Sequence, residues 1–340
     1  MLALRRKRQI EEASPSVDAS VSRRRVGLLV RTIVGTLVTL LVTSAVTFIA
    51  ANGTGIDIAR KKLGREAAPA QLAAFRLEHG LDQPLVVRYE KWLVSFVQGD
   101  WGVSPITDRP VRQDVQPRLV NTAVLAFAAL VFALPLSVGL GMFAAKRAGR
   151  RSDAFVSTAS TVVAAMPEFV VGVLVVLLLG IELHLAPVDS TNISISTSFW
   201  PKAYAFVLPT ITLILVLMPY LTRMARASTR EALSASYVQA ATLRGLPRRR
   251  VEWGHAMPNA AIPLVNAIAI NIVWLLGGTI VIENLFAFPG LGQLLVQAVG
   301  AGDTVTVQAI AMVMGTLFVL VSLTADLCVD ILNPKLRTVV

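Results

Sequence analysis

Six apolar stretches, each long enough to cross a lipid bilayer, dominate this sequence of 340 residues. The hydrocarbon core of a bilayer is about 30 Å thick, so a spanning helix needs roughly 20 apolar residues. The chain is 54% hydrophobic with a mean hydropathy of +0.65, which is high for a water-soluble globular protein. We therefore expect an all-α polytopic membrane protein with six transmembrane helices. Their expected bounds are 26–51, 119–145, 154–180, 203–221, 261–282 and 305–332.

The charges between these stretches predict the orientation of the chain. The formal net charge is +11, but the basic residues cluster at the ends of alternate spans, as the positive-inside rule describes. No nucleic-acid-binding motif accompanies them, so we expect membrane lipid and not nucleic acid as the surroundings. Both termini are then cytoplasmic, with residues 1–25 as a disordered basic tail. Residues 52–118 form a large external loop, or a small folded cap held by Trp92 and Trp101.

Catalytic and metal-binding motifs are missing from the sequence. His79, His184 and His255 have no metal-ligand spacing to one another or to Cys328. No Gly-Lys pair occurs, which excludes the usual phosphate-binding loop. The glycine-rich run at 139–144 lies inside an apolar span with no strand before it, so it indicates close helix packing. We expect no catalysis, no metal and no cofactor in this chain. If ATP drives its function, another chain hydrolyses the ATP.

The longest polar interruption in the second half of the chain is the 226–260 loop, between the fourth and fifth expected spans. Residues 230–244 contain no Pro or Gly and are rich in Ala and Leu, which predicts a helix. Gly245 and Pro247 should end that helix. A second short helix is predicted over 248–257, ending at Pro258. The arginines of this loop place it on the cytoplasmic side.

Eight residues of the loop have the spacing and identity of a known motif: Tyr237, Gln239, Ala240, Ala241, Arg244, Gly245, His255 and Pro258. They resemble the EAA loop of ABC importer permeases, and in particular their dipeptide and oligopeptide branch. Gln239 is a departure, because the family usually has an acid at this position. The resemblance implies that these eight residues couple the chain to an ATPase subunit. The alternative is an amphipathic surface connector without a partner.

The resemblance extends from the first span to Arg337 and implies the type I importer permease fold, with a permease core over 119–337 in a bacterial plasma (inner) membrane. It also implies three kinds of partner. A sister permease subunit forms the other half of the pathway. Two ATPase subunits bind ATP and Mg²⁺. An extracytoplasmic binding protein delivers the substrate, which we expect to be a short peptide. Nickel complexes, glutathione and oligosaccharides stay open, because relatives also carry these.

A self-sufficient secondary transporter or channel is the main alternative from another functional class. Such a carrier should show paired repeats and charged midplane residues in both halves. The sequence shows no internal repeat and few buried charges, and the 226–260 loop has no evident role in such a carrier. An intramembrane enzyme is a further alternative, but the sequence supplies no catalytic constellation for it.

Glu168, after Pro167 in the third span, is a candidate pathway residue. On a straight helix it would lie ~21 Å from the inner end of the span, past the midplane but within the membrane. An unpaired charge there costs roughly 2.5–3.5 kcal/mol. We therefore expect Glu168 to line the pathway and meet a cationic group such as a peptide amino terminus. The alternatives are a protonated or paired glutamate inside the bundle, or a position near the outer interface.

Phe288, Pro289 and Gly290 lie in the connection between the fifth and sixth spans, which contains two acids and no basic residue. The run resembles the external turn of the same permease family. This resemblance implies that the three residues lie at the external mouth of the pathway. A purely structural hairpin turn is the alternative.

Overall fold

The computed structural model describes residues 34–51, 58–64, 66–78, 80, 82–191 and 199–332. In these ranges the chain is helical apart from turns and one isolated bridge between Val103 and Pro110, so the all-α expectation is confirmed. The expected tail at 1–25 lies outside the described residues, as do the first part of the first span and residues 333–340.

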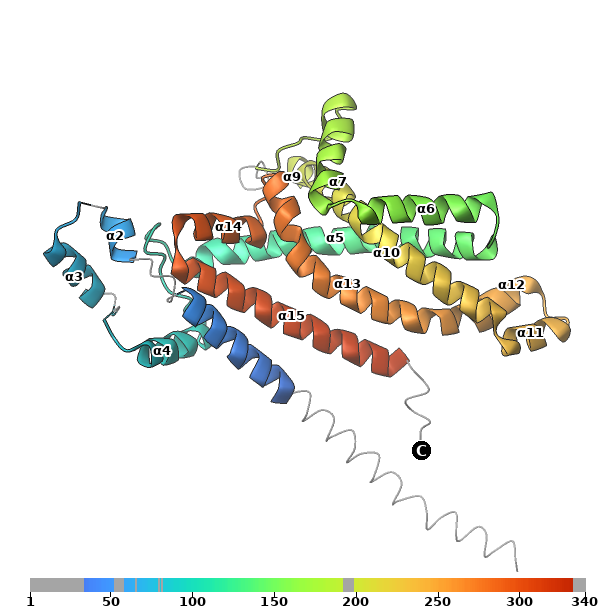
Figure 1. Ribbon diagram of the computed structural model, residues 1–340, viewed down its shortest axis with the longest axis horizontal. Coiled ribbons are helices and arrows are strands. Elements are labelled where there is room, and N and C mark those ends of the chain that lie inside the picture. The colour runs from blue at the N-terminus through green and yellow to red at the C-terminus, as the bar shows by residue number, and fades with distance from the viewer. Residues whose placement is uncertain are drawn as a thin grey trace, which may run out of the picture.

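The helices follow one another as a set of short helices near the N-terminus and a longer set that forms the body of the molecule (Figure 1). A helix over Val34–Ala51 comes first. Then come α2 (Ile58–Leu63), α3 (Pro69–Glu78), α4 (Leu85–Val97), α5 (Val111–Lys146), α6 (Arg151–Ala165), α7 (Glu168–Val175), the π-helical η1 (Val176–Glu182), α9 (Phe199–Ala205), α10 (Val207–Ser234), α11 (Ser236–Leu243), α12 (Arg248–Val251), the π-helical η2 (Glu252–Ala256), α13 (Met257–Leu285), α14 (Leu291–Ala301) and α15 (Thr304–Leu332).

The expected spans fall on helices as far as the described residues reach. Four helices are long and apolar enough to cross a membrane, and a bent pair makes a fifth candidate. The expected span at 261–282 lies within α13. α5 begins at Val111, before the expected start of the second span, and α14 occupies part of the connection between the fifth and sixth spans. The count of six crossings stays a prediction.

The third expected span is sharply bent and not straight. α6 ends at Ala165, α7 begins at Glu168, and the two helices make an angle of 105°. Met166 between them is extended (φ −82°, ψ 134°), as expected for a residue before proline. In Figure 1, α7 turns away from the line of α6. The straight helix assumed for the position of Glu168 is therefore wrong beyond Ala165, and the depth of Glu168 in the membrane stays a prediction.

α5 and α10 form the central helix pair, and a glycine allows their close approach. A Cβ atom on Gly141 would lie 2.6 Å from the Cβ of Ala225 and 2.7 Å from the backbone oxygen of Thr222. Any side chain larger than hydrogen would push the two helices apart. Gly141 of the glycine-rich run at 139–144 therefore serves close helix packing, whereas a Cβ on Gly139 would meet no atom within 4 Å. The largest buried cluster of the described chain surrounds this pair and includes Leu125, Leu208, Leu213, Leu217, Leu221, Leu275, Ile282, Phe286 and Phe288.

A buried carboxylate joins α5, α13 and α14 at the other end of the bundle. Glu283 is fully buried. The Thr122 hydroxyl donates to its Oε1 at 2.7 Å, and the backbone N–H of Gln293 donates to its Oε2 at 3.0 Å. A Cβ on Gly290 would lie 2.3 Å from the Glu283 carboxyl carbon. Because the first N–H groups of a helix have no intrahelical acceptor, Glu283 caps α14 and fixes the turn before it.

An aromatic run connects the first helix to the segment between it and α5. The Ser44 and Tyr89 hydroxyls are 2.7 Å apart, and the ring of Phe96 lies 5.6 Å from that of Trp101. Trp92 and Trp101 both pack in this run, which favours a folded cap, and the cap stays a prediction. The rings of the run are Phe48, Tyr89, Trp92, Phe96 and Trp101.

Candidate functional site

The helix predicted over 230–244 is interrupted. α10 ends at Ser234, Ala235 is extended (φ −66°, ψ 147°), and α11 starts at Ser236. The prediction of one continuous helix is therefore wrong. No Pro or Gly in the sequence marks the break at Ala235. The change of direction buries Val238 and Ala241 of α11 in a small core with residues from α10, α12, η2 and α13. Burial of this apolar surface favours a folded-back α11 over a longer α10. The members of that core are Ala232, Val238, Ala241, Val251, Ala256 and Ala260.

The end of α11 is where the sequence predicts it. Gly245 adopts φ +77°, in the left-handed region that favours glycine, and its N–H donates to the Thr242 oxygen at 3.0 Å. Pro247 then precedes α12 as its N-cap. No atom outside the neighbouring residues lies within 4 Å of a Cβ built on Gly245, so the position faces open space. Backbone conformation, not packing, is what requires glycine here.

Pro258 does not end the second short helix, contrary to the prediction. α12 continues through η2 into α13, and Pro258 is the second residue of α13. Proline is tolerated in the first turn of a helix because the N–H it lacks would have no partner there. The π-helical η2 makes the transition possible, since its wider turns change which N–H groups need acceptors.

α11 presents both small and apolar side chains to the surface. Tyr237, Ala240 and Arg244 share one helix face at spacings of three and four residues, and all are exposed. Leu243 is 89% exposed, an extreme value for leucine. Ala241 differs from its neighbours, because it is buried against the chain itself. Gln239 and His255 are exposed, as is Pro258.

The loop is tied to the end of α5 by an ion pair that the sequence did not indicate. Lys146 Nζ lies 2.6 Å from Glu252 Oε2, and Arg248 Nε donates to Oε1 of the same carboxylate at 3.0 Å. The hydrogen bond from Lys146 contributes most to lowering the pKa of the Glu252 carboxyl below its usual value, and the hydrogen bond from Arg248 adds to this effect. Lys146 also lies 5.8 Å from the centre of the Trp253 ring. These contacts link η2 directly to the end of α5.

A second ion pair joins α6 to α10 near the same end. Arg226 Nε lies 2.5 Å from Asp153 Oδ1, and its terminal nitrogen donates to Oδ2 at 2.8 Å. The backbone N–H of Gly149 also donates to Oδ2, at 3.0 Å. Asp153 is only 4% exposed. The Arg226 hydrogen bonds lower the pKa of Asp153 to about 2. Sequence patterns could not pair these residues, because they lie on separate helices.

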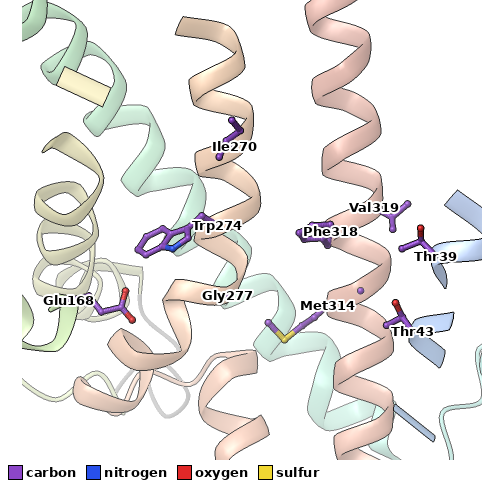
Figure 2. Close-up of a pocket in the computed structure, with 10 residues that line it drawn as sticks. Thr39, Thr43, Glu168, Ile270, Trp274, Gly277, Met314, Phe318 and Val319 are labelled. Carbon is purple, nitrogen blue, oxygen red and sulfur yellow. The ribbon is translucent and has the colours of Figure 1, made fainter. Parts of the chain in front are cut away.

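Glu168 lines two cavities. The larger, about 850 Å³, lies between α7, α13, α15 and the first helix. Figure 2 shows the Glu168 carboxylate and the Trp274 indole both directed into the space between α7 and α13. The smaller, about 400 Å³, has Glu168 and Trp274 in its wall together with Tyr220, Arg223 and Asn271. Pro167 itself is the N-cap of α7 and produces the bend that separates α6 from α7.

The turn expected at the external mouth is buried within the chain. Phe288 is fully buried and its ring meets that of Phe206 edge-on at 4.9 Å. Pro289 and Gly290 are also buried, and the Pro289 oxygen accepts a hydrogen bond from the Asn121 amide. These contacts support a structural role for the three side chains. Their location at the external mouth stays a prediction.

In the part of the chain that the structure describes, no group of three or more His, Cys, Asp or Glu residues could hold a metal ion. Comparison with known proteins then gives two family matches. Residues 137–338 match the model described as "Binding-protein-dependent transport system inner membrane component". Residues 25–110 match the model for the N-terminal part of the same kind of membrane component.

Individual relatives cover nearly the whole chain. "Glutathione transport system permease protein GsiC" of Escherichia coli (strain K12) is 30% identical over 91% of this chain and 98% of its own length. "Probable peptide ABC transporter permease protein y4tP" of Sinorhizobium fredii is 28% identical over the same shares. Among solved structures, an inward-facing MetNI methionine ABC transporter has 20% identity and a TM-score of 0.47, covering 64% of this chain and 93% of that one. The family matches include more than half of the sequence, and the chain belongs to the family of inner membrane components of binding-protein-dependent transport systems.

Proposed function

We propose that this permease forms one half of a peptide translocation pathway and is coupled to ATP hydrolysis through α11. The observation that carries the proposal is the construction of the 226–260 loop. α11 rests on its own small core, exposes Leu243 and Tyr237, and lies between α10 and α13. Exposed apolar side chains on a short, firmly supported helix are typical of a protein docking surface. The docking residues are Tyr237, Gln239, Ala240, Arg244, Gly245, His255 and Pro258, with Leu243 added. Ala241 is buried and supports α11 from within the chain.

The remaining partners follow from the same proposal. Two ATPase subunits bind ATP and Mg²⁺, a sister permease subunit completes the pathway, and an extracytoplasmic protein delivers the substrate. Only 11% of the apolar helix over Val34–Ala51 is buried within the chain. Its exposed surface favours contact with a partner protein or with lipid. Arginines in and beside the 226–260 loop favour a cytoplasmic loop, and both termini then lie in the cytoplasm.

Short peptides are the substrate class that the relatives favour, because the names of two of them refer to a peptide and to glutathione. Deletion of this chain should abolish uptake of labelled di- or oligopeptides, and the restored chain should recover it. Uptake of labelled glutathione in the same strains tests the second candidate. If the deletion leaves uptake of all these substrates unchanged, the peptide assignment fails.

Substitution at Gly245 tests the docking of α11. Asn and Asp both tolerate a positive φ better than most residues, and no nearby atom meets a side chain here. The two variants should therefore fold alike, but Gly245→Asp adds a negative charge beside the docking surface. We expect Gly245→Asp to lower uptake about fivefold or more at normal membrane abundance, as loss of a coupling energy between sites would.

The readouts are peptide uptake and ATP hydrolysis by the complete complex, with Gly245→Asn as the matched control. Gly245→Asn should stay within about twofold of wild type, because it changes only backbone preference. Equal uptake by both variants would show that Gly245 is a helix stop without a role in docking.

A further inference from the structure

The smaller cavity holds opposite charges at different parts of its wall. It opens where the 105° bend turns α7 away from α6. Glu168 enters it from the start of α7, and Arg223 enters it from α10. Tyr220, Asn271 and Trp274 also line it, so aromatic and amide groups accompany the two charges. A volume of about 400 Å³ is in the range of small-molecule sites, roughly 300–1,000 Å³.

Neither charged group is neutralised by an ion pair within the described ranges. One ion pair there uses Arg226, which is also on α10, and the others involve residues outside α7 and α10. Glu168 is only partly exposed. The Glu168 carboxylate therefore requires water or a cationic group to balance the cost of its partial desolvation. Arg223 is exposed, so its guanidinium is open to an anionic group of a ligand. The two side chains therefore favour a ligand that carries both charges itself.

We propose that Glu168 and Arg223 bind the two ends of a zwitterionic substrate in this cavity. Glu168 accepts charge-assisted hydrogen bonds from an ammonium group, whose positive charge also meets the face of Trp274. Arg223 donates to the carboxylate, for which its planar guanidinium offers two parallel N–H groups. This assignment rests on the proposed function and narrows its substrate class to peptides with free amino and carboxyl ends.

The chemistry of the wall distinguishes this substrate class from the others that relatives carry. A neutral oligosaccharide has no charge to balance either group, and the cavity would then hold two unpaired ions. The larger cavity shares Glu168, Ile270 and Trp274 with the smaller one and is lined otherwise by threonines and apolar groups. Glu168 thus lies where the two spaces meet, and the amino end of the substrate lies there with it.

The test combines a change in each protein side chain with a change at each end of the substrate, in the manner of a double-mutant cycle. The complete complex with its binding protein is reconstituted in vesicles, and uptake is measured for a tripeptide, its N-acetyl form and its C-terminal amide. The ratio of free to N-acetyl peptide should fall about tenfold in Glu168→Gln and stay unchanged in Arg223→Gln. The ratio of free to amidated peptide should fall about tenfold in Arg223→Gln and stay unchanged in Glu168→Gln.

Because every ratio uses the same binding protein, selection by that protein cancels between wild type and variant. Glu182→Gln and Arg151→Gln are matched controls outside both cavities, and neither should change a ratio. ATPase stimulation by the loaded binding protein reports that each variant complex is assembled. Equal loss for all three peptides, or unchanged ratios in both variants, overturns the proposed binding of the substrate's two ends by Glu168 and Arg223. Either result leaves the proposed function standing. A wild-type complex that imports none of the peptides contradicts the proposed function, and it also contradicts the proposed roles of Glu168 and Arg223.

Discussion

Gly141→Leu is expected to remove most of the folded protein from the membrane. The added Cβ alone would lie 2.6 Å from Ala225 Cβ and 2.8 Å from the backbone nitrogen of Arg226, distances that no relaxed structure shows. The neighbouring atoms include helix backbone, so relief requires that α5 and α10 move apart. Overpacking of this kind costs about 1–3 kcal/mol or more, which lowers the ratio of folded to unfolded protein by a factor of roughly 5 or more. In cells a loss of this size reduces the abundance of a protein several-fold, because the unfolded chains are degraded.

Gly139→Leu is the matched control on the same helix. A Cβ built on Gly139 has no neighbouring atom within 4 Å, so a larger side chain fits there. Membrane abundance and retention of a monodisperse peak after detergent extraction measure both variants. Gly139→Leu should resemble wild type. If Gly141→Leu accumulates to the same level as Gly139→Leu, α5 and α10 do not cross at this residue in the membrane.

Much of the fold could be predicted from the sequence, because apolar length and turn chemistry are local signals. The expected spans fall on helices since a run of apolar residues in lipid satisfies its backbone groups only as a helix. The end of α11 was predictable because Gly245 favours the left-handed conformation in which it is found. Pro167 in the sequence is compatible with the bend after α6, but a proline does not fix the angle of 105°.

The breaks and pairings that lack a local signal could not be predicted. Nothing about Ala235 disfavours a helix, and α11 folds back because the apolar side chains of a distant segment are there to cover Val238. Pro258 was read as a helix end, yet the same residue suits the first turn of α13. The cavity at Glu168 likewise depends on Arg223 and Trp274, which come from two other helices. Tertiary contacts decide such features, and a single sequence does not reveal them.

Loss of the Arg226 side chain is expected to destabilise the packing of α6 on α10. In Arg226→Met, Asp153 would stay buried with only the Gly149 N–H as a partner. Removing one member of a buried ion pair costs about 3–5 kcal/mol, and the partial exposure of Arg226 places this pair toward the lower end. The double variant Arg226→Met with Asp153→Asn should recover part of the loss, since it leaves no unpaired charge.

The pH dependence of unfolding separates this ion pair from simple loss of packing. The pKa of Asp153 is about 2 in the folded protein against 3.8 for an unperturbed aspartate. A lowered pKa means that the carboxylate stabilises the fold fully above about pH 4, and that this contribution disappears as the pH falls toward 2. Wild-type protein in detergent should therefore lose unfolding free energy over this interval, whereas Arg226→Met should lose less of it. Arg230→Met removes the same charge one turn further along α10 without breaking a hydrogen bond to Asp153. Because Arg230 contributes least to the lowered pKa of Asp153, this variant should keep a profile closer to wild type than Arg226→Met does. Parallel profiles for wild type and Arg226→Met would show that the pair contributes through its shape and not through its charges.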